Sequence, residues 1–210
     1  MSNTLITEYA MAIKNIIFDF GGVLIDWNPR YYYKNVFTDE SEMEFFLREI
    51  CGPQWSMIQD AGLPSEVATK QLQDQYPKYH REIGMFHKNW DIMIGGEIHE
   101  NTRLLQPLKT KYRLFGLTNW SAEYFPIVFE RYAFFRNFEG IIVSGVERMV
   151  KPDKNIYELL LKRYGLLATE SLFIDDNSKN TETAKELGFF TIHVNGDQNL
   201  EKHFLNLGLL

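Results

Sequence analysis

The fold of this chain is restricted above all by five short runs of apolar and β-branched residues, each bounded by polar residues or glycine. Apolar runs of this length and setting predict buried strands of a parallel sheet. The runs are Ile13–Phe20, Arg113–Thr118, Ile141–Ser144, Ser171–Asp175 and Phe190–Val194. Helical patterns at Asn155–Tyr164 and Thr181–Leu187 alternate with the later strands, and each stops at a glycine. The alternation predicts an α/β fold built on a doubly wound parallel sheet.

Residues 26–97 interrupt this alternation. The segment shows no convincing strand pattern, and its helical patterns fall at Ser41–Ile50, Ser65–Gln75 and Lys78–Met93. We therefore expect an all-helical cap at 26–97, inserted into an α/β core formed by 11–25 and 98–210. The Gly95–Gly96 pair at the exit of the insert suits a hinge or a plain loop equally well.

Both ends of the chain leave alternatives open. Met11 stands just before the first strand, so residues 1–10 are either a loose extension or a start assigned too early. At the other end, Asp197–Leu210 predicts a short closing helix with Leu200, Phe204 and Leu207 on one face. That face can pack on the core or form a dimer contact, so the sequence allows a monomer or a homodimer.

Composition excludes several classes of protein. Twenty-two basic against 28 acidic residues leave a net charge of −6, which argues against a nucleic-acid partner. A single cysteine, Cys51, and five scattered histidines exclude a disulfide framework and the usual zinc spacings. No apolar run approaches the ~20 residues that span a bilayer, and the first ten residues lack a secretory pattern. We expect a soluble cytoplasmic protein with no membrane partner.

Polar side chains capable of chemistry stand at the ends of four predicted strands. They are Asp19, the pair Thr118-Asn119, Lys151 and the pair Asp175-Asp176. Each alone has a simpler interpretation as a turn former, a helix cap or a solvated lysine. Ligands of open α/β sheets bind at the carboxyl ends of the strands, so together these residues predict one functional site.

The residue types match phosphoryl transfer through a covalent intermediate. Three carboxylates make an oxygen site suited to Mg²⁺, and one carboxylate can attack phosphorus. Lysine and hydroxyl donors then neutralise the charge on the phosphoryl oxygens. Magnesium-dependent phosphoryl transfer from a small phosphate ester follows as the leading hypothesis.

Four segments occur in the order and location of the motifs of the haloacid-dehalogenase-like (HAD) superfamily, which the chain resembles over nearly its whole length. They are Phe18–Leu24, Leu117–Asn119, Lys151-Pro152 and Ile174–Asn177. The resemblance implies a Rossmann-like core and a helical cap.

The same resemblance assigns roles to the residues of these motifs. It implies that Asp19 is the nucleophile, that Thr118 and Asn119 bind the phosphoryl group, and that Lys151 steadies both. It further implies a Mg²⁺ held by Asp19, by the carbonyl of Gly21 and by Asp176, with Asp175 bound directly or through water. Gly22, beside the nucleophile, is placed among the substrate contacts.

Gly21 departs from the family pattern. Phosphatases of the superfamily usually carry a second aspartate at this position, as general acid and then base, and glycine has no proton to give. Such acid catalysis is worth about 10²–10⁴-fold. The short form of the motif resembles the bacterial sugar-1-phosphate phosphatases, of which an α-glucose-1-phosphate phosphatase is a known type. An anomeric oxygen leaves more easily than an alkyl alcohol, which favours a sugar 1-phosphate as substrate.

Two other functions stay open. A dehalogenase would use the same Asp19 on carbon, but it needs no Mg²⁺ and favours an arginine from the cap to hold the halide. The Asp175-Asp176 pair would then repel without a cation. A non-catalytic phosphate- or partner-binding protein is the second alternative, with Gly21 as its positive evidence.

The insert supplies weaker candidates for substrate contacts. Trp27 and Trp55, near turns, are the aromatic residues selected as platforms for a sugar. Gln59 and Asp60 can reach a sugar hydroxyl, although a solvated helix end is the favoured interpretation. His80 and His87 are interpreted as surface or cap packing residues, and Cys51 as a buried residue at a helix end.

Overall fold

The computed structural model describes residues 12–195 and 199–210, so residues 1–10 and Asp197 lie outside the described residues. Five parallel strands form the central sheet in the order β5-β4-β1-β6-β7. They are β1 (Asn15–Phe18), β4 (Arg113–Thr118), β5 (Gly140–Val143), β6 (Ser171–Asp175) and β7 (Phe190–His193). All five predicted strands are therefore confirmed. The first is shorter than expected, because its regular pairing with β4 and β6 covers only Asn15–Phe18.

The sheet is buried on both faces because the side chains of β1 alternate between two apolar clusters. Ile16 and Phe18 belong to one cluster, which includes Phe204, whereas Ile17 packs in the other with Phe115 and Phe173. None of the three β1 side chains is exposed. This double burial confirms the doubly wound α/β architecture.

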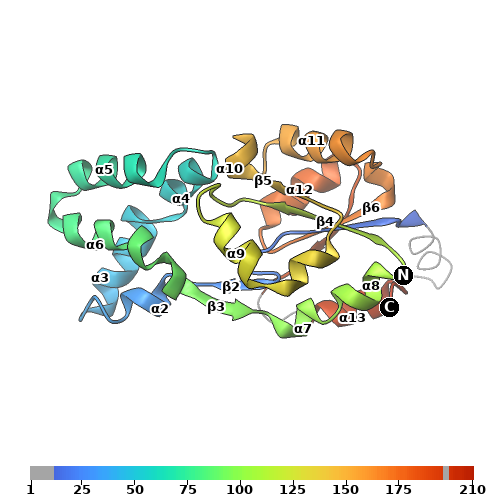
Figure 1. Cartoon of the computed structure of the whole chain (residues 1–210), viewed down its shortest axis with the longest axis horizontal. Coiled ribbons are helices and arrows are strands. Elements are labelled where there is room, and N and C mark those ends of the chain that lie inside the picture. Colours follow the sequence, from blue (N-terminus) through green and yellow to red (C-terminus); the bar gives the residue numbers. More distant parts are fainter. Residues whose placement is uncertain (1–11, 196–198) are drawn as a thin grey trace.

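Helices cover both faces of this sheet (Figure 1). On the side of Ile17 lie α11 (Lys154–Tyr164) and α12 (Ser178–Glu186), whose Tyr157 and Ala184 are buried in that cluster. The remaining elements of the core are α7 (His99–Thr102), α8 (Leu105–Lys109), α9 (Phe125–Arg131), η4 (Ala133–Asn137), α10 (Ser144–Glu147), η5 (Ala168–Glu170) and α13 (Leu200–Asn206). The predicted closing helix is α13, and its Phe204 lies 6.4 Å from Phe18, centroid to centroid. Its apolar face therefore closes this chain's own core.

The inserted helices, here called the cap, lie at the opposite end of the molecule from α8 and α13 (Figure 1). They are α2 (Arg30–Tyr33), α3 (Glu40–Phe45), η1 (Phe46–Ile50), α4 (Pro53–Asp60), α5 (Ser65–Gln75), η2 (Pro77–Tyr79), α6 (His80–Met85) and η3 (His87–Met93). The predicted helix at 65–75 is confirmed. The one at 78–93 is broken into three short segments, with a kink at Asn89.

The expectation that residues 26–97 contain no strand is wrong. β2 (Ile25–Trp27) and β3 (Ile94–Glu97) pair as an antiparallel ribbon where the cap joins the core. Gly95, predicted as part of a hinge or loop, lies in β3, where a Cβ would come within 2.3 Å of Oδ2 of Asp26. Strands of three and four residues containing aspartate and glycine carry no alternating apolar pattern, so the sequence did not reveal them.

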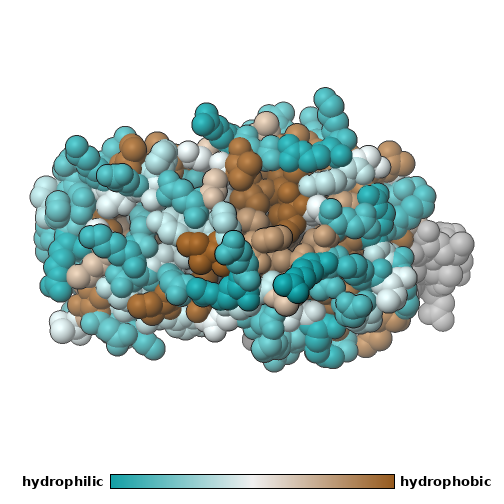
Figure 2. Space-filling model, viewed as in Figure 1, coloured by the Kyte–Doolittle hydropathy of each residue, from teal (hydrophilic) through white to brown (hydrophobic). Residues whose placement is uncertain are grey.

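Apolar residues gather at the middle of the face shown in Figure 2, where α9 and α10 lie. Phe129 of α9 and Val146 of α10 are exposed on these helices. α10 also contacts α4 of the cap, so this region borders the junction of cap and core. Within the described residues, no helix is both long enough and apolar enough to cross a membrane.

Candidate active site

The turn after β1 carries Asp19 to the carboxyl edge of the sheet. Its backbone N–H donates to the carbonyl of Ile174 at 2.8 Å, and its Oδ1 accepts from the N–H of Phe20 at 2.7 Å. Phe20 anchors the turn, because its ring covers Gly116, where a Cβ would lie 2.3 Å from Cζ. Two backbone hydrogen bonds and the packing of Phe20 thus hold Asp19 at the strand end, where the nucleophile is expected.

The turn after β1 requires a glycine at position 22. Its φ is +70°, and a Cβ there would lie 2.2 Å from Oδ2 of Asp176. Gly21 is different, since a Cβ at that position would meet nothing within 4 Å. The structure therefore places Gly22 directly against a candidate metal ligand and leaves open space beside Gly21.

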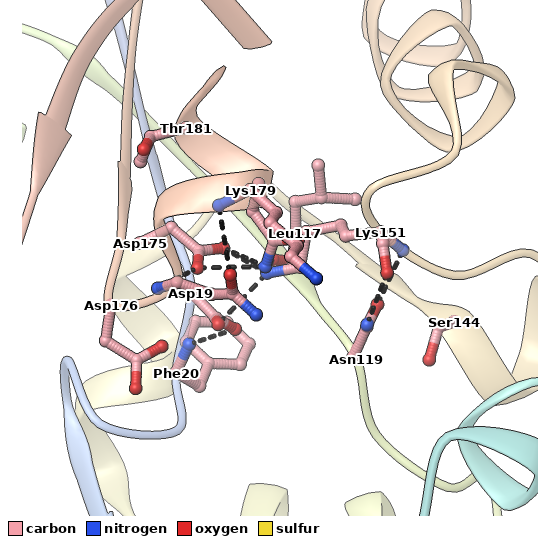
Figure 3. Close-up of polar contacts among 12 residues, drawn as sticks. Asp19, Phe20, Leu117, Asn119, Ser144, Lys151, Asp175, Asp176, Lys179 and Thr181 are labelled. Atoms are coloured by element: carbon pink, nitrogen blue, oxygen red, sulfur yellow. Dashed lines mark hydrogen bonds and ion pairs between the residues drawn. The ribbon is translucent and has the colours of Figure 1, made fainter. Parts of the chain in front are cut away.

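Lys151 is buried at the centre of the site (Figure 3). Its Nζ lies 3.0 Å from Oδ2 of Asp19 and 2.6 Å from Oδ2 of Asp175, and it donates to the carbonyl of Leu117 at 2.8 Å. Asn119 holds the lysine backbone, accepting from its N–H at 2.8 Å and donating to its carbonyl at 2.9 Å. The side chain of Asn119, expected to bind the phosphoryl group, therefore positions Lys151, and its contact with phosphate stays a prediction.

The two motif carboxylates at the end of β6, Asp175 and Asp176, differ in their surroundings. Asp175 is fully buried, and its oxygens accept from Lys151, from the N–H of Asn177 and from the amide of Asn180. Asp176 is exposed, and Figure 3 shows its carboxylate outside the network of dashed contacts. Among the described residues, Asp176 thus offers the freest oxygens, whereas those of Asp175 are already committed.

Charge is not balanced within this cluster. Burial raises the pKa of Asp19 to about 7, an effect that Lys151 opposes and that Asp175 and Asp176 reinforce. Oxygens of the three carboxylates lie within 4.8 Å of one another, and among the described residues Lys151 is the one ammonium that pairs with this cluster. Once all three are ionised, a divalent cation would compensate the excess negative charge, and an all-oxygen donor set fits Mg²⁺.

Thr118 adds an unsatisfied donor at the end of β4. Its side chain is buried, and its Oγ1 has no hydrogen-bond partner within residues 12–195 and 199–210. A buried hydroxyl left unpaired costs about 1–3 kcal/mol, which a bound oxyanion would recover by accepting its hydrogen bond. The residues present therefore fit a phosphoryl group as well as a cation.

A cavity of about 160 Å³ lies beside this cluster, between the cap and the loop that follows β4. Gly21 and Asn119 line it from the core. Its aromatic wall consists of Trp27, Phe86, His87, Trp90, Trp120 and Tyr124. Its polar wall consists of Ser56, Gln59, Asp60 and Ser121. Residues of the cap thus build more than half of the cavity lining, and the core completes it from Gly21 and the loop after β4.

The two tryptophans selected as sugar platforms have different positions. Trp27 lines the cavity, and its buried indole N–H has no partner in the described part of the chain. Trp55 is outside the cavity lining. Its indole donates to the carbonyl of Ala68 at 3.2 Å, and its ring meets Phe86 edge-on at 5.1 Å. The structure folds Trp55 into the core of the cap and so lends no support to the prediction that it is a substrate platform.

Asp60 and Gln59 do not form a solvated helix end, and that interpretation is corrected. Gln59 is buried and donates to the carbonyl of Trp55 at 3.0 Å. Burial raises the pKa of Asp60 to about 7, and the nearby charge of Lys151 opposes the rise only in part. The sequence pattern of α4 predicts a helix but does not indicate what covers its last turn.

His87, interpreted as a packing residue, also lines the cavity. Its Nδ1 lies 2.9 Å from Oγ1 of Thr69, its ring stacks on Tyr124 at 5.4 Å, and burial lowers its pKa to about 4. Trp90, Trp120 and Tyr124 carried no local signal either, since only the docking of η3 against the core brings them together. Cys51 is buried as expected, and burial raises the pKa of its thiol.

A doubly wound sheet with carboxylates at its strand ends and an inserted helical cap over them defines a capped α/β hydrolase. The family model described as haloacid dehalogenase-like hydrolase matches residues 16–194. The chain belongs to this family.

Several curated relatives are named as phosphatases. A sesquiterpene phosphatase of Aspergillus oryzae is 28% identical over 182 residues, which cover 86% of this chain and 89% of the relative. A D-ribitol-5-phosphate phosphatase of Bacteroides thetaiotaomicron is 24% identical, covering 85% of this chain and 90% of that protein.

Solved structures of the family show the same fold. The HAD family enzyme bt-2542 of Bacteroides thetaiotaomicron, in complex with magnesium and inorganic phosphate, superposes with a TM-score of 0.69 at 22% identity. The match covers 91% of this chain and 99% of that one. The L-2-haloacid dehalogenase of Xanthobacter autotrophicus has a TM-score of 0.64 at 15% identity, covering 92% and 82%.

Proposed function

We propose that this chain is a Mg²⁺-dependent phosphatase that hydrolyses a small phosphate monoester through a phosphorylated Asp19. The observation that carries the proposal is the buried contact of Lys151 with Asp19 and Asp175, next to a cavity that cap and core residues line together. Residues 26–97 act as the cap, which excludes water and selects the substrate.

Each residue of the cluster has a chemical task in this proposal. The carboxylate of Asp19 attacks phosphorus, the alcohol leaves, and water then hydrolyses the phosphoaspartate. Lys151 and the free hydroxyl of Thr118 stabilise the negative charge on the phosphoryl oxygens. Asp19, the Gly21 carbonyl and Asp176 would hold Mg²⁺ directly, and Asp175 would act through Lys151 and water. When bound, the cation neutralises charge on the cluster and on the phosphate.

A sugar phosphate is the substrate class that we propose first. Gly21 supplies no acid at the usual position, so unless another residue gives the proton, an ester whose oxygen leaves easily is favoured, such as an anomeric phosphate. The polar wall of Ser56, Gln59 and Ser121 offers partners for sugar hydroxyls. The name of the D-ribitol-5-phosphate phosphatase supports a phosphorylated carbohydrate.

The aromatic wall of the cavity favours a second candidate class, apolar phosphate esters. Trp27, Phe86, Trp90, Trp120 and Tyr124 present ring surface to the same cavity. Aromatic walls bind apolar groups through buried area. The sesquiterpene phosphatase among the relatives is named for such a substrate.

Dehalogenation is less well supported by the cavity. Among the described residues that line it there is no arginine to hold a halide. The three clustered carboxylates would also repel one another in a reaction that uses no cation.

The first experiment measures phosphate release from 4-nitrophenyl phosphate with Mg²⁺ and with chelator. Metal-dependent release that disappears in Asp19→Asn supports the phosphatase, and the variant also controls for a contaminating enzyme. Paired sugar 1- and 6-phosphates and a prenyl phosphate then separate the two substrate classes. Absence of release from every ester would contradict the proposal in favour of a non-catalytic protein. Halide release from a haloacid would instead identify a dehalogenase.

A further inference from the structure

We propose that Asp60, carried by the cap, supplies the proton that Gly21 cannot, acting first as general acid and then as general base. The inference rests on the proposed phosphatase function. It assigns a catalytic role to a residue outside the strand-end cluster, on a helix of the insert.

The cavity places Asp60 and Gly21 around the same space. Asp60 is the last residue of α4, and it lines the cavity together with Gly21, two residues after the nucleophile, and Asn119, which holds the backbone of Lys151. Lys151, which contacts Asp19 directly, is also near enough for its charge to act on Asp60. A leaving oxygen expelled from the phosphorus into this cavity would therefore find a carboxyl group contributed by the cap.

The turn after Asp60 is fitted to the core. Gly62 has a φ of +98°, and a Cβ there would lie 3.2 Å from the carbonyl of Gly145 and 3.1 Å from Cγ of Arg148. A little further along, the N–H of Ser65 donates to Glu123 at 3.2 Å, and the Ser65 hydroxyl donates to the same carboxylate. Two contacts with the core thus fix the position of Asp60 whenever the cap is docked.

The other ionisable groups near the cavity do not duplicate this role. Lys151 approaches from the core, Arg148 packs beside Gly62, and His87 and Tyr124 line the cavity. Burial lowers the pKa of His87 to about 4, so its ring is uncharged at pH 7 and a weak acid. Burial raises the pKa of Asp60 to about 7, which suits a group that gives and takes a proton near neutrality.

The proton balance closes over two steps. In the first, an Asp19 oxygen bonds to phosphorus, the ester P–O bond breaks, and the leaving oxygen takes the proton of Asp60. In the second, the Asp60 carboxylate removes a proton from a water molecule. The oxygen of that water bonds to phosphorus as the bond between phosphorus and Asp19 breaks. Ester and water become alcohol and phosphate, and both aspartates return to their starting states.

The test compares Asp60→Asn with wild type on an alkyl and an aryl phosphate. Aryl oxygen needs little protonation, so we expect the ratio of kcat/KM for alkyl over aryl ester to fall about 10²–10⁴-fold. Asp74→Asn, an exposed aspartate on α5 of the same cap, is the matched control and should keep the wild-type ratio. An equal loss on both esters would overturn the assignment and mark Asp60 as merely structural.

A second variant keeps the test decisive. The open space beside Gly21 accommodates a side chain, so Gly21→Asp in the Asp60→Asn protein should restore much of the alkyl-to-aryl ratio. If the double variant still hydrolyses the aryl ester with Mg²⁺ but the ratio is not restored, the slow alkyl hydrolysis of Asp60→Asn is not due to a missing proton donor, and the assignment fails. If wild type releases no phosphate even from the aryl ester, the phosphatase proposal itself fails and the role of Asp60 fails with it.

Discussion

Nζ of Lys151 lies 2.6 Å from Oδ2 of Asp175, and neither side chain has any exposed surface. A buried ion pair gains less from its attraction than it loses by leaving water unless further hydrogen bonds satisfy both groups. Here the remaining partners are the Leu117 carbonyl and Asp19 for the lysine, and the Asn177 N–H and the Asn180 amide for the aspartate. The pair therefore holds the nucleophile in place through a network in which each member depends on the others.

Removing the lysine should destabilise the protein strongly. Lys151→Met leaves Asp19 and Asp175 buried without a counter-charge, which should lower the free energy of unfolding by about 3–5 kcal/mol. Lys14→Met is the control, since Lys14 pairs with Glu170 at the surface and such pairs contribute about 0–1 kcal/mol. Urea denaturation of both variants in chelator measures the difference. Equal losses would show that the buried network does not stabilise the fold.

Magnesium should stabilise the folded protein through Asp176. Thermal unfolding in increasing MgCl₂ should raise Tm, because a ligand at 100 times its Kd adds about 2.7 kcal/mol. Asp176→Asn should remove most of this shift, since Asp176 offers the freest oxygens of the cluster. Glu158→Gln, an exposed change on α11, should keep it. A shift retained in Asp176→Asn would place the cation elsewhere.

The neighbouring glycines should respond differently to alanine. Gly22→Ala forces a Cβ against Asp176 at a positive φ, and we expect a loss of about 1–3 kcal/mol in stability together with loss of the magnesium shift. Gly21→Ala meets open space and should fold nearly as well as wild type. Calorimetry with and without MgCl₂ compares the two. Similar losses in both would contradict the proposed fit of Gly22 against Asp176.

Stability should depend on pH through Asp60. Its folded pKa of about 7 lies above the ordinary 3.8, so between these values the folded state keeps a proton that the unfolded chain has lost. Stability contributed by this group is therefore lost as pH rises through about 7. Asp60→Asn removes the effect, so wild type should lose more stability than the variant between pH 5 and pH 8. Urea unfolding at both pH values measures this difference. Equal changes in the free energy of unfolding for wild type and variant would refute the raised pKa of Asp60.

Substitutions of Trp27 and Trp55 should have different effects, the first on substrate binding and the second on stability. Trp27→Phe removes a buried N–H that lines the cavity, so we expect a higher KM with little change in stability. Trp55→Phe removes the hydrogen bond to Ala68 inside the cap, which should lower stability by about 0.5–1.5 kcal/mol and leave KM close to wild type. Steady-state kinetics and denaturation on both variants provide the measurement. A KM effect confined to Trp55→Phe would reverse the assignment.

Local pattern was sufficient for the sheet but insufficient for the junction with the cap. The strand at 113–118 was predicted with the observed bounds because its apolar residues are buried on both faces. β2 and β3 were missed because their short sequences carry no periodic apolar pattern. They approach closely where Gly95, which has no side chain, lies against the carboxylate of Asp26. The same holds for Trp55, whose position depends on Phe86 and Ala68 rather than on the turn next to it.

The sequence by itself determined the parallel sheet and the gathering of Asp19, Thr118, Lys151 and the Asp175-Asp176 pair. The physical reason is that parallel strands end at one edge, so polar residues at their carboxyl ends must meet there. Only the tertiary structure decided which cap residues face that edge. Asp60 and His87 reach the cavity because Gly62 fits against the α10 region and because η3 packs on Tyr124. These contacts join residues 34 to 86 positions apart, which no local pattern encodes.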